Sequence, residues 1–347
     1  MKILFIAGGS DPRTLGGIET FGRKIKDFFL KELQFITYKT NKKHYFKVED
    51  VKEIYSSNIF MKGLNKIFKN KIRMFILKKE IEKIKPDICI INRPDEIYAL
   101  NNKVKKILVQ HRCFDNYILT YLGKNIKLIE YLKKNLDYFV FLSEYDRERF
   151  IKELGFSEGK TIAIRHSCEM EVLSKNKIKN KNLIMIARLE NNIKRFDLPI
   201  KVMKKLPDFT LNIYGDGRDK KKLENLIRKE SLKNVILHGG TNQIKEKLDE
   251  NSVFIMTSDF EGYGITNIEA MRRGLPLIVR NTFEAAKDIV IDNGILLEKE
   301  WNEDKFIEAI RKIYDNYEDY SQNAIKQSKR YESELIKEKW KELINNL

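Results

Sequence analysis

The chain has 347 residues, more than one hydrophobic core usually organises, so two domains are expected. Hydrophobic residues make up 42% of it, yet no run reaches the roughly 18 consecutive apolar positions that span a bilayer, which argues against an integral membrane protein. The formal net charge of +17 predicts an anionic partner such as nucleic acid, an anionic membrane face or a phosphorylated substrate, unless it reflects lysine-rich codon usage.

The first residues predict a strand and give no sign of export. They read MKILFIAGGSDPRTLGG, with one lysine and a short apolar stretch before polar turn residues. The cysteines, Cys89, Cys113 and Cys168, are odd in number and far apart, which indicates neither a disulfide framework nor a clustered metal site. A cytoplasmic location is therefore expected.

Short apolar runs rich in Ile, Val and Phe alternate with helical patterns, which predicts βα units on buried parallel sheets. Six runs in the first half begin at residues 2, 33, 87, 106, 138 and 161, and six in the second half begin at residues 182, 211, 234, 253, 276 and 294. The polar, basic stretch 168–182 between the two sets is the predicted hinge.

The expected fold class is therefore α/β, with two Rossmann-like, doubly wound domains that face each other across a cleft. The predicted domains are an N-terminal Rossmann-like domain at 1–168 and a C-terminal Rossmann-like domain at 169–330. Residues 331–347 form a predicted terminal helix that packs back toward the first domain. Ligands of such sheets bind outside the carboxyl ends of the strands, so functional residues should follow strands.

A glycine pair follows the first predicted strand. Gly16 and Gly17 precede the helix that is expected to start near Ile18, and they allow backbone amides to approach a ligand at that helix N-terminus. The alternative is a simple chain turn. The pattern is not G-x-G-x-x-G, so a dinucleotide cofactor is not favoured.

Two cations follow the first strand of the second half. Arg188 ends that strand and Lys194 lies at the entry to the next helix, an arrangement that suits a diphosphate. A solvated basic loop is the alternative. Gly215 with Gly217, and Gly239 in the run HGG, then follow the next two strands as turns that permit close approach or only change the chain direction.

The stretch FEGYGITNIEAMRRGLP, residues 260–276, combines glycines and acids around one helix start. Gly262 and Gly264 allow the loop to curl, so that amides near Ile265 and Thr266 point at an anion from the positive end of the helix.

Glu261 lies before this helix and Glu269 about one turn inside it. An ionised carboxylate only accepts hydrogen bonds, so it suits the hydroxyls of a sugar. The alternative for each acid is stabilisation of the helix dipole, which is worth only about 0.3 to 1 kcal/mol.

This pattern, E-G-Y-G-I-x-x-x-E-A-M-x-x-G-x-P, resembles the E-x7-E signature of retaining GT-B glycosyltransferases of family 4, glycosyl transferases group 1. The resemblance covers almost the whole chain. It includes the Gly-Gly-x-Glu start, VQH ending at His111, FLSEYDRERF, the Arg188 and Lys194 pair, LNIYGDG and HGG.

The resemblance implies that Glu261 holds hydroxyls of the donor sugar and Glu269 holds the ribose. Arg188 and Lys194 would neutralise the leaving diphosphate, and His111 would lie beside the sugar unless it is a packing histidine. The implied donor-binding residues are Gly17, Gly215, Gly239, Gly262, Tyr263, Gly264, Ile265, Thr266 and Glu269.

Two departures from the family pattern qualify these roles. The chain has RHS, residues 165–167, where a Pro-Asn-Gly turn is usual, and Arg195 stands where a glycine is common. Lys194 and Arg195 are therefore alternatives for the same role.

The resemblance implies a retaining, hexosyltransferase-type enzyme that needs no metal and no other cofactor. No two aspartates are separated by a single residue, so the D-x-D metal clamp is absent. The expected reaction moves a sugar from a nucleotide-sugar, with a UDP-sugar favoured, to a glycan or lipid-linked acceptor in capsule, lipopolysaccharide or glycolipid synthesis. The alternatives are a nucleic-acid acceptor and a non-catalytic nucleotide-sugar-binding module.

Residues 61–85 carry nine Lys or Arg against two Glu, with apolar residues along one helical face. Such a segment is expected to dock on the anionic cytoplasmic face of a membrane, each basic residue adding about 1 kcal/mol. A helix that packs on its own sheet is the alternative.

Overall fold

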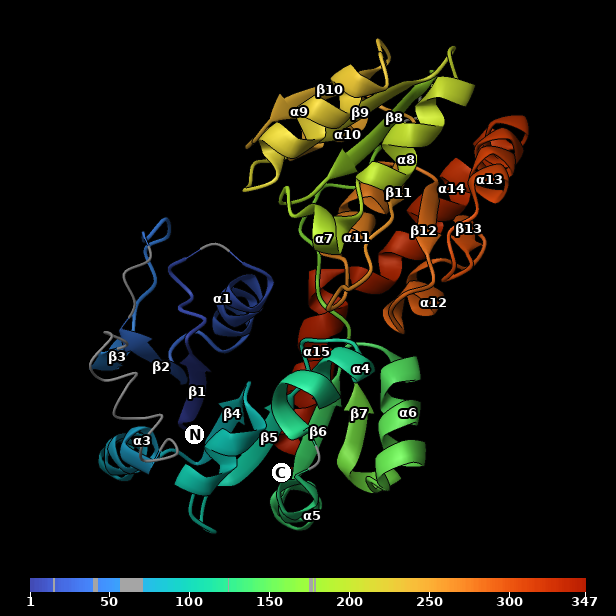
Figure 1. Cartoon of the computed structure of the whole chain (residues 1–347). Helices are drawn as coiled ribbons and strands as arrows, with labels where there is room; N and C mark the ends of the chain where they lie inside the picture. Colours follow the sequence, from blue (N-terminus) through green and yellow to red (C-terminus); the bar gives the residue numbers. More distant parts are fainter. Residues whose placement is uncertain (15, 40–42, 57–70, 124, 175–176, 178) are drawn as a thin grey trace. The chain divides into compact units, whose positions relative to one another are not determined.

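The computed structural model describes residues 1–14, 16–39, 43–56, 71–123, 125–174, 177 and 179–347. They form two compact units (Figure 1), of which the first consists of Met1–His166 with Lys337–Leu347 and the second of Ser167–Ile336. The division falls between His166 and Ser167, and the chain returns to the first unit within the last helix, α15 (Ser333–Asn345). None of the described helices combines the length and the apolar character needed to cross a membrane.

The first unit contains a seven-stranded parallel sheet in the order β3-β2-β1-β4-β5-β6-β7. The strands are β1 (Ile3–Gly8), β2 (Leu33–Lys39), β3 (Val51–Ser56), β4 (Ile88–Ile91), β5 (Lys105–Val109), β6 (Tyr138–Phe141) and β7 (Thr161–Ala163). The helices are α1 (Gly17–Phe29), α3 (Lys71–Ile84), η1 (Pro94–Ala99), α4 (Phe114–Tyr117), η2 (Ile118–Leu122), α5 (Ile126–Asn135), α6 (Glu144–Leu154) and η3 (Glu158–Lys160).

The two faces of this sheet are buried by different helices, because successive side chains of a strand point to opposite faces. Leu4 and Ile6 of β1 join a core that includes Leu77 and Ile81 of α3. Phe5 points the other way and packs against Phe21 of α1 with ring centroids 6.0 Å apart. The near-continuous apolar runs seen in the sequence follow from this burial on both faces.

One strand of the first unit was not predicted. The sequence predicts six strands, and the structure adds β3 at the edge of the sheet, paired with β2 alone. Its residues Lys52 and Glu53 are exposed, and Ile54 is its buried apolar residue. An edge strand of this composition carries too little apolar alternation to be recognised.

The basic segment 61–85 is described only in part. Residues 61–70 lie outside the described residues, and the helix α3 begins at Lys71. Its residues Leu77 and Ile81 pack into the core of the first unit, whereas Phe75 is exposed. One face of α3 therefore packs within its own unit, as the alternative to membrane docking predicts.

The second unit contains a six-stranded parallel sheet in the order β10-β9-β8-β11-β12-β13. The strands are β8 (Asn182–Ile186), β9 (Thr210–Tyr214), β10 (Val235–Gly239), β11 (Val253–Met256), β12 (Leu277–Arg280) and β13 (Gly294–Leu297). The helices are α7 (Asn191–Lys194), α8 (Asp197–Val202), η4 (Met203–Lys205), α9 (Lys220–Lys229), α10 (Ile244–Asp249), α11 (Ile265–Arg272), α12 (Ala285–Ile289), α13 (Glu303–Asp315), α14 (Tyr317–Ser328) and η5 (Lys329–Tyr331).

Both sheets confirm the predicted doubly wound class. In each, the strand order runs outward in both directions from the first strand of the unit, so the topology reverses between β1 and β4 and between β8 and β11. Loops that leave adjacent strands in opposite directions open a crevice at such a switch point, where doubly wound sheets bind ligands.

Candidate active site

The carboxyl ends of β8 and β11 bring two predicted site residues into contact. The two strands pair in parallel, so the loops that follow them leave the same edge of the sheet. Lys194, the last residue of α7, donates from Nζ to Glu261 Oε1 at 2.5 Å. The Lys194 side chain is 20% exposed and the Glu261 side chain 11%, so the pair is largely withdrawn from water.

Ser258 is a third member of this cluster, and the sequence did not single it out. Its hydroxyl donates to the same Glu261 oxygen at 2.7 Å. Among the described residues no bond is formed by Glu261 Oε2, which leaves that oxygen able to accept from a hydroxyl. The cluster therefore contains a carboxylate acceptor that is held by two donors, one of them a cation.

Backbone bonds hold α7 against the loop that follows β11. Thr257 Oγ1 donates to the carbonyl oxygens of Lys194 and Arg195, at 3.1 and 3.0 Å. The Asp259 amide donates to the carbonyl of Ile193 at 2.7 Å. The position of the Lys194 side chain is thus set by the chain itself and not only by its ion pair.

Arg195 has a different role from Lys194. Its guanidinium pairs with Asp197 and with Asp259, each at 3.1 Å, and the hydrogen bond that it donates to Asp197 raises the pKa of Arg195. Arg280 pairs with the other oxygen of Asp259 at 2.7 Å. Of the two alternatives, Lys194 is therefore the cation that contacts Glu261, whereas Arg195 forms an ion pair with the loop that follows β11.

The backbone at Arg195 explains why a glycine suits this position. Arg195 has φ 52° and ψ 44°, which is the left-handed region. Side chains with a Cβ adopt that region at a steric cost that glycine avoids. The ion pairs with Asp197 and Asp259 offset this cost here.

The structure does not bring Arg188 into contact with the Lys194 and Glu261 pair. Arg188 lies in the loop after β8, and its side chain is 67% exposed. Its nearest acid is Glu190, with Nη1 3.6 Å from Oε1. A guanidinium held this loosely is able to move toward an anionic ligand, or simply to stay in solvent.

Gly264 shapes the start of α11. It is the N-cap residue with φ 78° and ψ 54°, and a Cβ there would lie 2.6 Å from Asn267 Nδ2. Ile265 and Thr266 are the first two residues of the helix, so their amides have no carbonyl partner inside it. These amides and the helix dipole form the predicted anion site.

The other predicted residues around α11 differ in exposure. Gly262 is half-buried in the loop before the helix. Tyr263 is buried, with its ring 6.3 Å from the ring of Tyr331, so it packs within the second unit. Glu269, the fifth residue of α11, is half-buried.

Gly215 is required by the packing of the second unit. A Cβ at Gly215 would lie 1.9 Å from the carbonyl oxygen of Ala187, so the turn after β9 passes directly over the loop after β8. The Gly215 amide donates to the carbonyl of Gly239 at 2.7 Å. Gly239, in contrast, has space around it, because no atom lies within 4 Å of a Cβ built there.

Gly17 and His111 belong to the first unit. Gly17 is the first residue of α1, and a Cβ built there would meet nothing within 4 Å. His111 follows β5, with Nε2 2.9 Å from Asn92 Oδ1 and its ring 4.8 Å from that of Phe21. Burial, helped by His166 and Arg112, holds the pKa of His111 well below its usual range, so the ring is neutral at pH 7.

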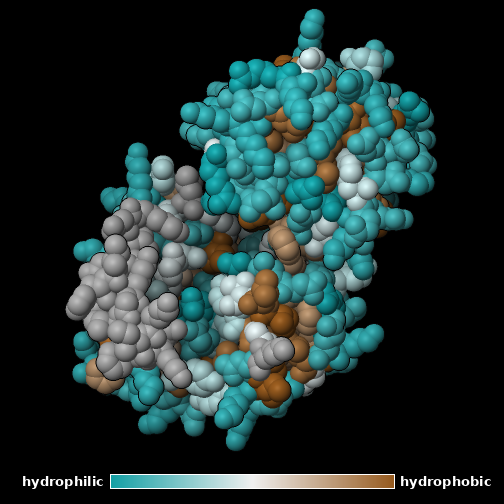
Figure 2. All heavy atoms as spheres, viewed as in Figure 1, coloured by the Kyte–Doolittle hydropathy of each residue, from teal (hydrophilic) through white to brown (hydrophobic). Residues whose placement is uncertain are grey.

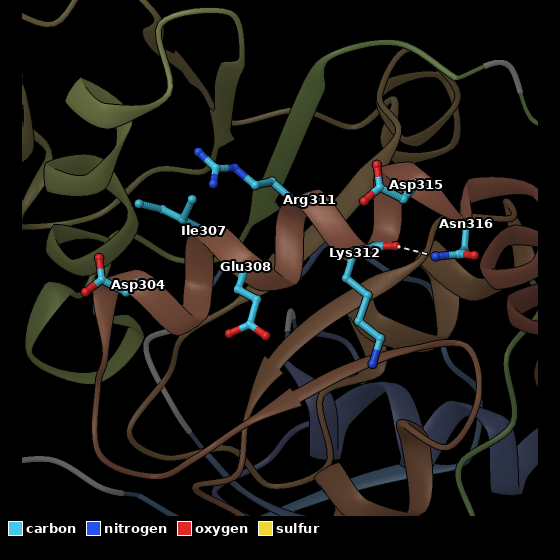
Figure 3. A pocket seen from close by; sticks show the side chains of 7 residues that line it. All are labelled: Asp304, Ile307, Glu308, Arg311, Lys312, Asp315 and Asn316. Carbon is cyan, nitrogen blue, oxygen red and sulfur yellow. Dashed lines mark hydrogen bonds between the residues drawn. The ribbon is translucent and has the colours of Figure 1, made fainter.

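A hollow of about 390 Å³ on the second unit does not belong to this site. Figure 3 shows that its lining comes from α13 and the residue that follows it. Its lining mixes acidic and basic side chains, namely Asp304, Glu308, Arg311, Lys312 and Asp315. A one-sided surface of mixed charge provides no convergent set of groups for a ligand.

One group of described residues resembles a metal-ligand set. Atoms of Asp11, His44 and Glu53 lie within 4.8 Å of one another. The Arg13 guanidinium forms ion pairs with both carboxylates, at 2.6 and 2.5 Å. The protein therefore supplies its own cation there, and we assign no metal to this group.

The second unit matches a known family. Residues 170–331 match the model described as "Glycosyl transferases group 1". The O-antigen biosynthesis glycosyltransferase WbnH of Escherichia coli is 25% identical over 303 residues, which cover 84% of this chain and 86% of WbnH.

Solved structures show the same architecture. The lipopolysaccharide outer core galactosyltransferase WaaB superposes over 100% of both chains with a TM-score of 0.79 and 20% identity. TarM of S. aureus, solved in complex with UDP and alpha-GlcNAc-glycerol, has a TM-score of 0.65 and 23% identity over 78% of this chain, which spans 59% of TarM. The match to glycosyl transferases group 1 thus covers the second unit, and the two Rossmann-like units have the GT-B fold.

Proposed function

We propose that the chain is a retaining glycosyltransferase that moves a hexosyl group from a nucleotide-sugar, with a UDP-sugar favoured, to a glycan or lipid-linked glycan acceptor. The observation that carries this proposal is the Lys194, Glu261 and Ser258 cluster at the switch point between β8 and β11. The O-antigen relative and the UDP bound to TarM support the product class and the donor base.

The donor would be held by acceptors for its hydroxyls and by positive charge for its diphosphate. Glu261 is fixed through Oε1 by Lys194 and Ser258, and its Oε2 suits the hydroxyls of the sugar. Glu269 is proposed to bind the ribose. The amides of Ile265 and Thr266 would bind the diphosphate at the N-terminus of α11.

Lys194 is suited to hold Glu261 and the diphosphate at the same time. An ammonium group has three N–H donors, of which the structure uses one for Glu261. The other two are free to face a phosphate. Arg188 would add a second cation as its exposed side chain moves in.

In the proposed reaction the bond from the anomeric carbon to the phosphate oxygen breaks, and the acceptor oxygen bonds to that carbon on the same face. The acceptor hydroxyl proton goes to the departing phosphate oxygen, so the products are the glycoside and the nucleoside diphosphate. Negative charge grows on the leaving group, and its proposed stabilisers are Lys194, which contacts Glu261, and the amides at the start of α11. Glu261 positions the sugar and forms no covalent bond, and no metal is required.

A panel of UDP-, GDP- and ADP-sugars tests this function. We expect one nucleotide class to raise the melting temperature and to be hydrolysed slowly, and Glu261→Ala to abolish hydrolysis while the protein remains folded. NMR spectroscopy of the first sugar anomer released reports retention or inversion. Failure of all three classes to bind would refute the proposal.

A further inference from the structure

A second charged cluster lies in the first unit, at the switch point between β1 and β4. Three arginines gather near the carboxyl ends of the central strands, and we call them the arginine cluster. Arg93 follows β4, Arg112 follows β5, and Arg73 projects from α3. No role in the donor site has been given to any of the three.

Tyr121 connects two of these arginines. The guanidinium carbon of Arg93 lies 5.8 Å from the centroid of the Tyr121 ring, and that of Arg112 lies 5.4 Å from the same centroid. Arg112 donates from Nη1 to Asn116 Oδ1 at 2.8 Å, and within the described part of the chain it has no acidic partner. Its charge is therefore not balanced by an ion pair.

The acids of the cluster do not balance its three cations. Asp95 is shared, since it pairs with Arg93 at 3.1 Å and also with Arg73. Glu96 is fully buried and accepts a hydrogen bond from Tyr38 Oη at 2.9 Å. Burial, reinforced by Asp95, raises the pKa of Glu96 to about 8, so this carboxyl group is mainly neutral at pH 7.

Several buried polar atoms of the same cluster lack partners among the described residues. They are Arg73 Nε, Glu96 Oε2, Arg112 Nε and Tyr117 Oη. Tyr117 is fully buried, and the charges of Asp95, Arg93 and Glu96 act on its hydroxyl. A buried polar group without a partner is costly, so several such atoms in one cluster indicate a ligand.

We infer that the arginine cluster binds a phosphate ester, with Arg93 and Arg112, which both lie near the Tyr121 ring, as its two ligands. A guanidinium binds a phosphate through paired N–H groups, and a dianion matches the two cations that Asp95 leaves unbalanced. The assignment of this phosphate to the acceptor rests on the proposed function. Binding of the phosphate itself does not depend on it.

The phosphate ester has two possible sources, a soluble polyol phosphate and a lipid headgroup. Figure 2 shows exposed apolar atoms on the first unit. Close to Tyr121 in the sequence, Leu119 is 80% exposed and Ile126 is 71% exposed. Such residues beside an anion site suit a phosphate that is attached to a lipid, and the two sources require separate measurements.

Calorimetric titration of glycerol 3-phosphate into the full chain, with saturating UDP present to occupy the proposed donor site, tests the site. We expect Arg112→Gln and Arg93→Gln each to weaken binding about tenfold or more, the loss of one charge-assisted contact. The matched control is Arg149→Gln, because Arg149 stacks on Phe114 and pairs with Asp115 and Glu153 near the same elements. It should bind like the unmodified chain.

The second source is measured by sedimentation with vesicles of phosphatidic acid against vesicles of phosphatidylcholine. The site is supported if the unmodified chain binds either phosphate source and this binding is lost in Arg112→Gln and Arg93→Gln. Circular dichroism must show that both variants are folded. Absence of binding to both sources, or equal loss in Arg149→Gln, overturns it. UDP affinity is measured in parallel, so failure of the donor proposal is seen separately from failure of this one.

Discussion

Replacement of Lys194 by methionine isolates the charge in the proposed donor site. Methionine keeps much of the length of the side chain but removes the donor that contacts Glu261 Oε1 at 2.5 Å. Ser258 continues to donate to that oxygen, so Glu261 stays partly anchored. The change therefore tests the cation more than the shape of the loop.

Two magnitudes follow from the geometry. Glu261, with 11% of its side chain exposed, loses one charged hydrogen bond, and the free energy of unfolding should fall by about 1 to 3 kcal/mol. Removal of a group that stabilises charge on the leaving diphosphate should lower kcat by about 10² to 10³-fold. The loss of rate thus exceeds what the loss of stability explains.

The assay measures nucleoside diphosphate release at saturating donor, together with thermal unfolding of the same samples. Lys205→Met is the matched control, since Lys205 pairs with Glu303 at 2.8 Å on the surface of the same unit. We expect Lys205→Met to retain full turnover. Turnover of purified Lys194→Met near that of the control would refute the role of Lys194 in stabilising the leaving group.

A double-mutant cycle separates a shared role from two independent roles. If Lys194 and Glu261 act as one unit, Glu261→Gln combined with Lys194→Met should cost little more than the worse single change. Additive losses in ln kcat would show that the two residues act separately, and the proposed bridging by Lys194 would then be wrong.

Further outcomes are expected from other parts of the chain. Addition of a chelator should leave donor hydrolysis unchanged, and a strict Mg²⁺ or Mn²⁺ requirement would contradict the mechanism. Arg280→Leu should lower the free energy of unfolding by about 2 to 4 kcal/mol, measured by urea denaturation, because the largely buried Asp259 pair is broken. The pKa of Glu96 in the folded state is raised to about 8, so the unmodified chain loses stability as the pH rises toward that value. The variant Glu96→Gln does not have this loss. It should therefore be more stable than the unmodified chain between about pH 4.5 and 8, and equally stable at lower pH. Flotation should favour anionic over neutral vesicles if residues 61–85 dock on a membrane, and equal failure with both would remove that proposal.

Much of the architecture could be predicted from the sequence, because the strands of a parallel sheet with both faces covered appear as apolar runs. β8, β9, β11 and β12 are largely buried, whereas β10 and β13 at the two edges are only partly buried, and all six appear as apolar runs that were predicted. β3 was missed, since an edge strand with Lys52 and Glu53 exposed leaves little pattern. The order of the strands, and hence the switch points, follows from the structure and not from the runs themselves.

Site residues could be predicted from the sequence only where they belong to a recognisable motif. The sequence singled out Lys194 and Glu261 but left Lys194 and Arg195 as alternatives, which differ in the structure through the left-handed backbone at Arg195 and its two aspartates. Ser258 was missed because a serine two residues past a strand is common. Ser258 is assigned to the site because its hydroxyl contacts Glu261, and this contact cannot be predicted from the spacing of residues in the sequence.

The same topology gives the two units chemically different switch points. Between β8 and β11, Lys194 forms an ion pair with Glu261, so the acid there has a cation as its direct partner. Between β1 and β4, Glu96 is fully buried beside another acid, which favours its neutral form and leaves the neighbouring arginines in excess. A site of the first kind suits a sugar with its diphosphate, and one of the second kind suits an anion alone. We therefore propose that the partners and burial of the glutamate at each switch point favour different ligands in the two units.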